Sequence, residues 1–561
     1  MEDEKIKEME NTVFATVILR SRTGKSLFES AGQKHRDTRE FRPLPETFFD
    51  ATREFEKMGF KIVSEGKFSL TIVAPRKKFE EVFRVRLKQE EQPLFREKET
   101  PMTRYYVTDE EINIPEEIAD LVEKITLPKP ARLLQSANAP NPSYHHLDVP
   151  GMISSLIKAT APHSHGFTGK NINVVMIDTG FYTHPYYKNK GYSITLNSLF
   201  GDPNHDYIGH GTAIAANLLA VAPDINFTMV KFAELFGFFV LSFPLAGFQT
   251  ARNLHPDIIT CSWGTNFDAA LEAEIEDAVN VDGIAVVFAC GNQGSVEWPG
   301  EMPDVISVGG AYIDDSHINW QASSYASSGQ SSTYDKRIVP DVCGIVGQAP
   351  EGILIVMPTE PNCYFEQIFG GGSFPNKDET KKDDGWVVAS GTSSAAPMVA
   401  GTVALMLQKN SNLSPNTIKA ILMVTARDII TGQSASGAIA TVGYDYATGY
   451  GLIDAQEALD ACFIATAAYG SKLAPEVQFL RSFRNAWIGS SGVGKVLVDK
   501  IEQLYYKHSP PIAKAMRHDM RIKRIIRHFI VTPIVKLLHF GVNITNRRFQ
   551  SGKITYNRGE D

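Results

Sequence analysis

Cysteine is scarce in this chain, and its spacing fits neither a disulfide framework nor a metal site. The 561 residues include five cysteines and no CxxC pair. This low, odd count excludes a disulfide scaffold and favours reduced thiols. The five positions are Cys261, Cys290, Cys343, Cys363 and Cys462.

Long apolar runs are also lacking. The first 20 residues, MEDEKIKEMENTVFATVILR, open with alternating charges and hold no apolar core of about 7–15 residues, which argues against a secretory signal. No window reaches the roughly 18 uncharged apolar residues that a membrane-spanning helix needs. We therefore expect a soluble, cytoplasmic protein without a transmembrane span.

The chain as a whole has no strong excess of one charge. Its net charge is −8 and its isoelectric point is about 6.0, so nothing global indicates a nucleic-acid partner. With 43% hydrophobic and 21% charged residues, a coiled-coil rod, a collagen-like chain and a wholly disordered protein are excluded. The balance is nevertheless uneven, because residues 463–561 carry a net charge of +11 against −19 for the rest.

Changes in composition and in the pattern of apolar residues along the chain predict four segments. Residues 1–130 alternate short strands and helices, which predicts an α+β domain. Residues 131–150 are rich in Pro, Asn, Ser and His and are expected to form a linker. Residues 151–460 are expected to form an α/β domain, and residues 461–561 a mostly helical module.

The order of elements in the first segment is β-α-β-β-α-β, which is the split-βαβ, or ferredoxin-like, pattern. A Glu-Gly pair at positions 65 and 66 marks a hairpin between the second and third strands. The predicted strands are residues 12–19, 61–63, 69–73 and 83–87, and the predicted helices are residues 46–58 and 77–82.

Short continuous apolar runs distinguish the third segment. Such runs are typical of strands that are buried on both faces of a parallel sheet, so we expect a doubly wound α/β sheet. The runs are residues 174–177, 227–230, 258–262, 285–289 and 305–308.

Four polar residues lie where chemistry is expected in such a sheet. Asp178 and Asn292 each follow an apolar run, and polar side chains at the carboxyl end of a parallel strand face the ligand crevice. His210 stands in Gly-His-Gly-Thr, while Ser393 stands in a small-residue turn before an Ala-rich helix, whose N-terminus favours a developing oxyanion. Each also has a structural interpretation, as a turn or capping residue or as a buried histidine.

Taken together, these motifs closely resemble those of the subtilisin-like serine peptidases, family S8. The resemblance spans residues 170–460 and includes the family's order of Asp before His before Ser. It implies that Asp178, His210 and Ser393 form a catalytic triad and that Asn292 contributes to the oxyanion hole. It also implies a substrate-binding edge, formed by Ser262, Trp263, Gly264 and Gly291.

The resemblance implies a serine endopeptidase that acts on protein or peptide substrates and needs no cofactor. Calcium is frequent in the family, but no ligand loop is legible here, so no metal site is predicted. Trp263 and the sequence GNQGS resemble the related sedolisins more than the subtilisins. The Glu/Asp pair of the sedolisins, however, is not recognisable in this chain. Some 60 residues between Pro340 and Gly401 are expected to be an insertion near the cleft. Because of this insertion, the sequence does not predict the substrate specificity.

Two other functions are consistent with parts of the sequence. One is a catalytically silent binding protein that keeps the subtilisin fold and is anchored by its C-terminal tail. The other is a dimeric aspartic protease built on the Asp-Thr-Gly motif at Asp178, since two such carboxylates share a proton in those enzymes. An intact set of Asp178, His210, Asn292 and Ser393 disfavours the silent protein.

The flanking segments resemble known modules as well. Residues 44–87 are similar to the activation prosegments of sedolisins and subtilisins, which implies an autoprocessed zymogen whose first 150 or so residues act as an intramolecular inhibitor. A permanent regulatory or protein-binding domain is the alternative.

From Cys462 onward the sequence CFIATAAYGS closely resembles the CFI-box C-terminal domain. Residues 513–538 are basic and amphipathic, so the tail is a candidate for binding an anionic membrane surface or for packing on the acidic remainder.

Overall fold

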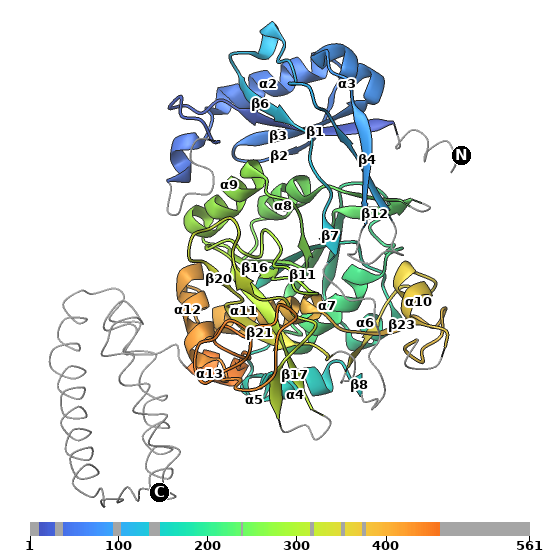
Figure 1. The fold of residues 1–561 in the computed structure, drawn as a ribbon, viewed down its shortest axis with the longest axis vertical. Coiled ribbons are helices and arrows are strands. Elements are labelled where there is room, and N and C mark those ends of the chain that lie inside the picture. Colours follow the sequence, from blue (N-terminus) through green and yellow to red (C-terminus); the bar gives the residue numbers. More distant parts are fainter. Residues whose placement is uncertain are drawn as a thin grey trace, which may run out of the picture. The chain divides into compact units, whose positions relative to one another are not determined.

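The computed structural model describes residues 11–28, 37–93, 102–133, 146–236, 239–314, 319–348, 354–372 and 377–460 (Figure 1). The chain divides into two compact units, Met1–Leu459 and Asp460–Asp561. The predictions for Cys462, for the CFI-box and for the basic tail lie outside the described residues, as does most of the predicted linker. Within the described ranges, no helix is long and apolar enough to cross a membrane.

The N-terminal residues form a four-stranded antiparallel sheet in the order β2-β3-β1-β6. Two helices pack on the face of this sheet that is uppermost in Figure 1, and they bury Phe55, Phe79 and Phe83 against it. Connections and strand order are those of a split βαβ fold. The elements are β1 (Thr12–Leu19), α2 (Pro45–Lys57), β2 (Lys61–Glu65), β3 (Ser69–Pro75), α3 (Arg76–Phe83) and β6 (Val122–Thr126).

The strand predicted at residues 83–87 is wrong. Helix α3 continues to Phe83, and Arg84 ends it in a left-handed conformation with φ 50°. The next amides bond back to the helix, because the Val85 N–H donates to the Glu80 carbonyl and the Leu87 N–H donates to the Glu80 carboxylate. The alternating apolar side chains of these residues are buried in the N-terminal core, but their backbone forms a turn and pairs with no strand. The fourth strand of the sheet is β6.

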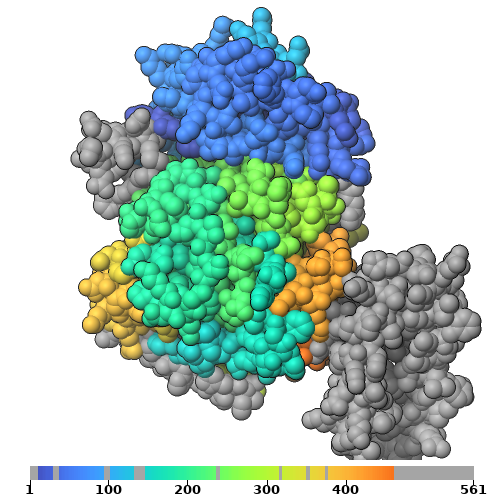
Figure 2. Space-filling view, turned by 180° about the vertical axis from the view of Figure 1, so that it is seen from behind, coloured from blue at the N-terminus to red at the C-terminus, as the bar shows by residue number. Residues whose placement is uncertain are grey.

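A charged hairpin leaves the N-terminal sheet and joins the strands of the next domain. Strand β5 (Met102–Val107) pairs with β4 (Lys88–Pro93) on one side and, in parallel, with β13 (Phe239–Ser242) on the other. Strand β12 (Ala233–Phe236) completes this sheet, whose order is β12-β13-β5-β4. Figure 2 shows the N-terminal residues, in blue, directly against the green residues that follow them in the chain.

The main sheet has the order β10-β11-β9-β14-β16-β17-β18, with β21 paired to β17. Its pairings are parallel except that between β17 and β18, which confirms the predicted doubly wound α/β architecture. The strands are β9 (Asn173–Asp178), β10 (Ile194–Ser198), β11 (Asn226–Lys231), β14 (Ile258–Cys261), β16 (Ala285–Ala289), β17 (Ile306–Ile313), β18 (Trp320–Ala322) and β21 (Val342–Ile345).

Helices cover both faces of the main sheet. Helices α8 and α9 lie between it and the N-terminal sheet, while α7, α11 and α12 lie on the other side (Figure 1). Helix α11 packs against α7 and against strands β14, β16 and β17. The bounds are α7 (His210–Val221), α8 (Pro244–Asn253), α9 (Ala269–Asp277), α11 (Thr392–Lys409) and α12 (Pro415–Thr425).

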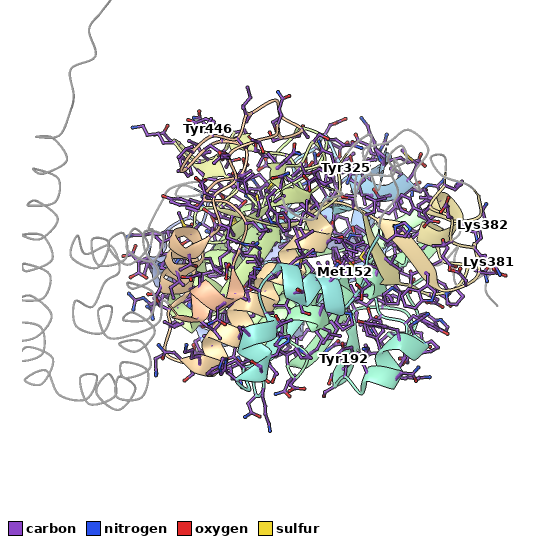
Figure 3. The ribbon with its side chains drawn as sticks, turned by 90° about the horizontal axis from the view of Figure 1, so that it is seen from below. Met152, Tyr192, Tyr325, Lys381, Lys382 and Tyr446 are labelled. Carbon is purple, nitrogen blue, oxygen red and sulfur yellow. The ribbon has the colours of Figure 1, made fainter. Side chains whose placement is uncertain are left out.

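The remaining elements are short. Between β21 and α11, two antiparallel strands are separated in the chain by a short helix, and the exposed Lys381 and Lys382 of this region lie at the edge of the molecule in Figure 3. These elements are β7 (Arg132–Leu133), β8 (His146–Leu147), α4 (Gly151–Leu156), α5 (Thr160–Ser164), α6 (Pro185–Lys190), β15 (Trp263–Gly264), β19 (Gly329–Gln330), β20 (Ile338–Val339), β22 (Leu354–Pro358), α10 (Tyr364–Phe369), β23 (Trp386–Ala389) and α13 (Ala455–Asp460), with single turns at Thr38–Phe41, Glu116–Ile118 and Ala278–Asp282.

Candidate active site

Asp178 and His210 form a fully buried pair. Asp178 is the last residue of β9 and His210 is the first of α7, and the His210 Nδ1 lies 2.6 Å from the Asp178 Oδ1. Because an ionised carboxylate only accepts, Nδ1 carries the proton and Nε2 is left as the acceptor of the imidazole. Among the described residues, Nε2 is buried and has no hydrogen-bond partner.

Asp206 fixes the loop that precedes His210, and the sequence analysis missed it. Its Oδ1 accepts from the Thr179 hydroxyl at 2.7 Å and from the Gly209 N–H at 2.9 Å. Its Oδ2 accepts from the N–H and the hydroxyl of Thr212, at 2.8 and 2.7 Å. A carboxylate at the first turn of α7 satisfies amides that have no partner within the helix. Asp206 therefore ties the end of β9 to the start of α7 and holds the Asp178–His210 geometry.

Ser393 is the second residue of α11 and lies beside the end of β14. Its hydroxyl donates to the Ser262 carbonyl at 3.1 Å, and the Ser262 hydroxyl donates to the Ser393 carbonyl at 2.9 Å. The turn into the helix needs glycine at position 391, where φ is 150°. These contacts bring Ser393 to the carboxyl edge of the sheet, where β9 and β14 are neighbours.

Asn292 follows β16 and is oriented by the residue before Ser393. Its Oδ1 accepts from the Thr392 N–H at 3.0 Å and from the Thr392 hydroxyl at 3.1 Å. This pattern assigns the oxygen to the side of Thr392 and directs the Nδ2 donor away from it. The Thr392 hydroxyl also lies 3.2 Å from the Gly291 carbonyl, so the loop after β16 contacts the start of α11 at two residues.

The predicted substrate-binding edge is a short strand that another segment of the chain already occupies. Strand β15 pairs antiparallel with β7, with Trp263 opposite Leu133 and Gly264 opposite Arg132. The Trp263 side chain is buried in the core, where its indole N–H donates to the Ile177 carbonyl at 2.8 Å. The edge therefore binds an extended chain through its backbone, by strand addition.

The segment on β15 is held on its other side as well. The Ala131 N–H donates to the Ser242 hydroxyl at 2.8 Å, at the end of β13. The Pro130 carbonyl accepts from the Gln92 side chain at 2.8 Å. Residues just before position 134 are thus bonded to side chains of β13 and β4 as well as to β15.

The insertion after Pro340 covers the imidazole, in line with its predicted place near the cleft. The Phe365 ring packs edge-on against the His210 ring, with centroids 5.5 Å apart. The Thr359 hydroxyl donates to the Gly209 carbonyl at 3.0 Å, and the Phe365 N–H donates to the Ile208 carbonyl at 3.0 Å. The insertion is therefore part of the wall of the site.

The described cysteines are free and buried, and none is a nucleophile at neutral pH. Cys363 lies next to this site, 3.1 Å from the Thr359 hydroxyl. Burial raises the pKa of the Cys363 thiol to about 12, and burial likewise raises the pKa of Cys261, Cys290 and Cys343. Because a thiol needs to ionise to attack, these groups act as small apolar residues.

Comparisons with known proteins agree on one family. The model of the subtilase family (Peptidase_S8) matches residues 169–451. Subtilisin E of Bacillus subtilis is 29% identical over 289 residues, which are 48% of this chain and 65% of the relative. The serine protease AprX of the same organism is 27% identical over 303 residues, with 48% and 64% covered. The chain spans just under two thirds of the length of these relatives.

One solved structure with similarity to this chain is fervidolysin from Fervidobacterium pennivorans, described as a keratinolytic enzyme related to subtilisin. The two are 17% identical, with a TM-score of 0.49, and the match covers 80% of this chain and 61% of the other.

Proposed function

The chain belongs to the subtilase family, and we propose that it is a serine endopeptidase that hydrolyses peptide bonds through an acyl-enzyme. The observation that carries the proposal is the buried Asp178–His210 pair, with its 2.6 Å contact and a His210 Nε2 that has no partner among the described residues. A buried imidazole with an open acceptor nitrogen is suited to take the proton of a nucleophilic hydroxyl.

In the first half of the proposed reaction, the Ser393 Oγ attacks the scissile carbonyl carbon and its proton passes to the His210 Nε2. Asp178 holds the imidazole in the required tautomer and stabilises the imidazolium. When the tetrahedral intermediate collapses, the C–N bond breaks and the imidazolium gives its proton to the leaving amine. Water then attacks the acyl-enzyme with His210 as base, which releases the acid and restores the Ser393 hydroxyl.

We assign the oxyanion hydrogen bonds to the Asn292 Nδ2 and the Ser393 backbone N–H. The contacts of Thr392 support the first, because they identify the amide oxygen as the acceptor on the Thr392 side and so make the Nδ2 the donor on the other side. Ser393 lies in the first turn of α11, where backbone amides are not used within the helix, which supports the second.

We also propose that the N-terminal segment is an inhibitory prosegment that the enzyme removes from itself. Support comes from the pairing of β7 with β15, because this segment occupies the strand that a substrate would use. The described pairing ends at Leu133, opposite Trp263, and the next residue of the edge is Ser262, whose carbonyl contacts the Ser393 hydroxyl. A chain that continued in this register would present the bond after position 134, so we expect cleavage between Leu134 and Gln135, earlier than the linker end near Pro150.

The two other functions fit the site less well. An aspartic protease would need the Asp178 carboxylate to share a proton with a second carboxylate, but here it is buried against an imidazole. A silent binding protein would gain nothing from an ordered, buried Asp178–His210 pair.

Hydrolysis of a fluorogenic peptide by the processed protein tests the proposal. A fluorophosphonate should abolish turnover, pepstatin should leave it unchanged, and Ser393→Ala should lower kcat by on the order of 10⁶. Ser394→Ala is the matched control, because the adjacent hydroxyl faces the Met357 sulfur and should be dispensable. Turnover that survives in Ser393→Ala, or that pepstatin blocks, would contradict the proposal.

A further inference from the structure

The loop that leads into His210 is bonded, one residue after another, to a segment about 150 residues further along the chain. This segment, residues 359–365 of the insertion, is called the clasp below. Three of its donors bond three successive carbonyls of the loop at 2.9–3.0 Å. The pairs are the Tyr364 N–H with Tyr207, the Phe365 N–H with Ile208, and the Thr359 hydroxyl with Gly209.

Glu360 extends the clasp to the start of the loop with both oxygens of its carboxylate. Its Oε1 lies 2.7 Å from the His205 Nδ1, and its Oε2 accepts from the Asp206 N–H at 2.5 Å. The Glu360 side chain is only 10% exposed, so water competes little for these contacts. One carboxylate thus fixes two successive residues, and the second is Asp206, which holds the Asp178–His210 geometry.

A buried ammonium holds the other side of the same loop. Lys231 is the last residue of β11, and its Nζ donates to the His205 carbonyl at 2.8 Å and to the Asp202 carbonyl at 3.1 Å. Its charge is paired with Glu234 at 2.6 Å. Because this contact with the main sheet does not involve Glu360, a change at Glu360 should displace the loop without unfolding it.

The clasp has a frame of its own. It begins where β22 ends, and β22 pairs antiparallel with β23 on one side and parallel with β8 on the other. The loop before His210 is therefore aligned against a strand-anchored segment, which is the kind of support that a precisely placed catalytic group needs.

We propose that Glu360 is a positioning residue of the peptidase, which acts through Asp206 to keep His210 where proton transfer from Ser393 requires it. The inference rests on the proposed function and deepens it. Proton transfer needs the base within hydrogen-bond reach of the hydroxyl, and a small displacement lowers its rate steeply. Because Glu360 contacts the loop and not the substrate edge β15, its effect is expected on kcat and not on KM.

Two substitutions separate the contacts of Glu360 from its charge. Glu360→Gln keeps the length of the side chain, so its amide oxygen still accepts from the Asp206 N–H and its amide nitrogen can donate to a neutral His205. Glu360→Asp keeps the charge but is one methylene shorter, so it cannot reach both partners.

The first measurement is kcat and KM of the processed protein on a fluorogenic peptide, per active site titrated with a fluorophosphonate. Glu360→Gln should stay within about threefold of the wild-type kcat, whereas Glu360→Asp should lose about tenfold or more, with KM within about twofold in both. A wild-type kcat in Glu360→Asp would overturn the proposal. A lower kcat in Glu360→Gln than in Glu360→Asp would also overturn it, because the charge and not the contacts would then matter.

Glu366→Gln is the matched control. Glu366 is a buried carboxylate of the same insertion, and the amides that it binds, those of Asn362, Gly385 and Trp386, lie outside the loop before His210. This variant should keep the wild-type kcat even if its melting temperature falls. A loss as large as that of Glu360→Asp would overturn the assignment to Glu360, because any disturbance of the insertion would then suffice.

A second readout does not depend on turnover. The proton between the His210 Nδ1 and Asp178 should give a low-field resonance in the proton NMR spectrum, which reports on their 2.6 Å contact. In full-length Ser393→Ala protein, which cannot digest itself, Glu360→Asp should shift or broaden this resonance and Glu360→Gln should leave it in place. An unchanged resonance in Glu360→Asp would overturn the proposal. A wild type that cuts no peptide would overturn the proposed function instead, and the spectrum would still decide whether Glu360 positions His210.

Discussion

Asn292 illustrates how residues around the site depend on contacts that are distant in sequence. The glycines near it in the sequence are a local signal, and they were enough to identify Asn292 as a candidate site residue. Its orientation is set by Thr392, whose N–H and hydroxyl both donate to the Asn292 Oδ1. The flanks of Asp178, His210 and Ser393 likewise carry local signals. Asp206 has none, because its contacts form only when the end of β9 and the start of α7 are brought together.

Replacing the amide of Asn292 should therefore affect the transition state more than the bound substrate. We expect Asn292→Ala to lower kcat by about 10²–10³ with little change in KM, because its donor serves charge that develops during the reaction. Steady-state kinetics on one peptide measure both constants. Thr392→Ser keeps the orienting hydroxyl and should remain close to wild type, and a rise in KM with an unchanged kcat in Asn292→Ala would assign the residue to ground-state binding.

Secondary-structure elements were predictable where burial alone determines them. The apolar runs that end near Asp178, Cys261 and Ala289 are strands of the main sheet, as expected. The prediction failed at residues 83–87, where buried alternating side chains line a turn whose amides bond to Glu80. Strand β4 was missed for the opposite reason, since its sequence KQEEQP has no apolar alternation and its pairing partners come from elsewhere in the chain.

A buried charge cluster joins elements around the main sheet and makes stability depend on pH. Asp341, just before β21, pairs with Arg337 at 2.6 Å and with Lys419 of α12 at 2.9 Å, and accepts from the Ser307 N–H of β17 at 2.8 Å. Burial raises the pKa of Asp341, but Lys419 and Arg337 outweigh it and lower the pKa from 3.8 to about 2. A carboxylate with a depressed pKa stabilises the fold above its unfolded pKa, and that contribution is lost as pH falls through the folded pKa.

Asp341→Asn should accordingly be destabilised at pH 6, and its deficit relative to the parent protein should shrink by about 2 kcal/mol between pH 4 and pH 2. Urea unfolding at several pH values in a Ser393→Ala background, which prevents self-digestion, measures this difference. Asp335→Asn, at an exposed position in the same loop, should show no such trend. A deficit that stays constant down to pH 2 would mean that Asp341 is not ionised in the folded protein.

At the scale of the whole molecule, the N-terminal sheet is fitted to the helices that flank the substrate edge. The Ser64 hydroxyl donates to the Gln249 side chain of α8 at 2.6 Å, and the Lys67 N–H donates to the Glu274 carboxylate of α9 at 2.7 Å. Between them, a Cβ on Gly66 would lie 2.0 Å from the Glu274 Oε1. Such complementarity was not predictable from the sequence, because the hairpin and both helices look like ordinary solvated elements until they meet.

Self-processing is the prediction that belongs to this scale. Wild-type protein of 62.0 kDa should release an N-terminal fragment of about 15 kDa, with a new N-terminus at Gln135. Intact-mass spectrometry and N-terminal sequencing measure both, and Ser393→Ala should stay full-length. A cut near Pro150 would contradict the register inferred from β7 and β15, whereas a fully active enzyme that never shortens would make the N-terminal unit a permanent domain.

The most direct test of the central claim is to react the processed protein with a fluorophosphonate and map the adduct by tandem mass spectrometry. The mechanism built on Asp178, His210 and Ser393 predicts one adduct per chain on the Ser393 Oγ, formed because His210 takes the hydroxyl proton. Asp178→Asn should slow its formation, and Ser393→Ala should abolish it. An adduct on another residue, or labelling of Ser393→Ala at the wild-type rate, would contradict the account.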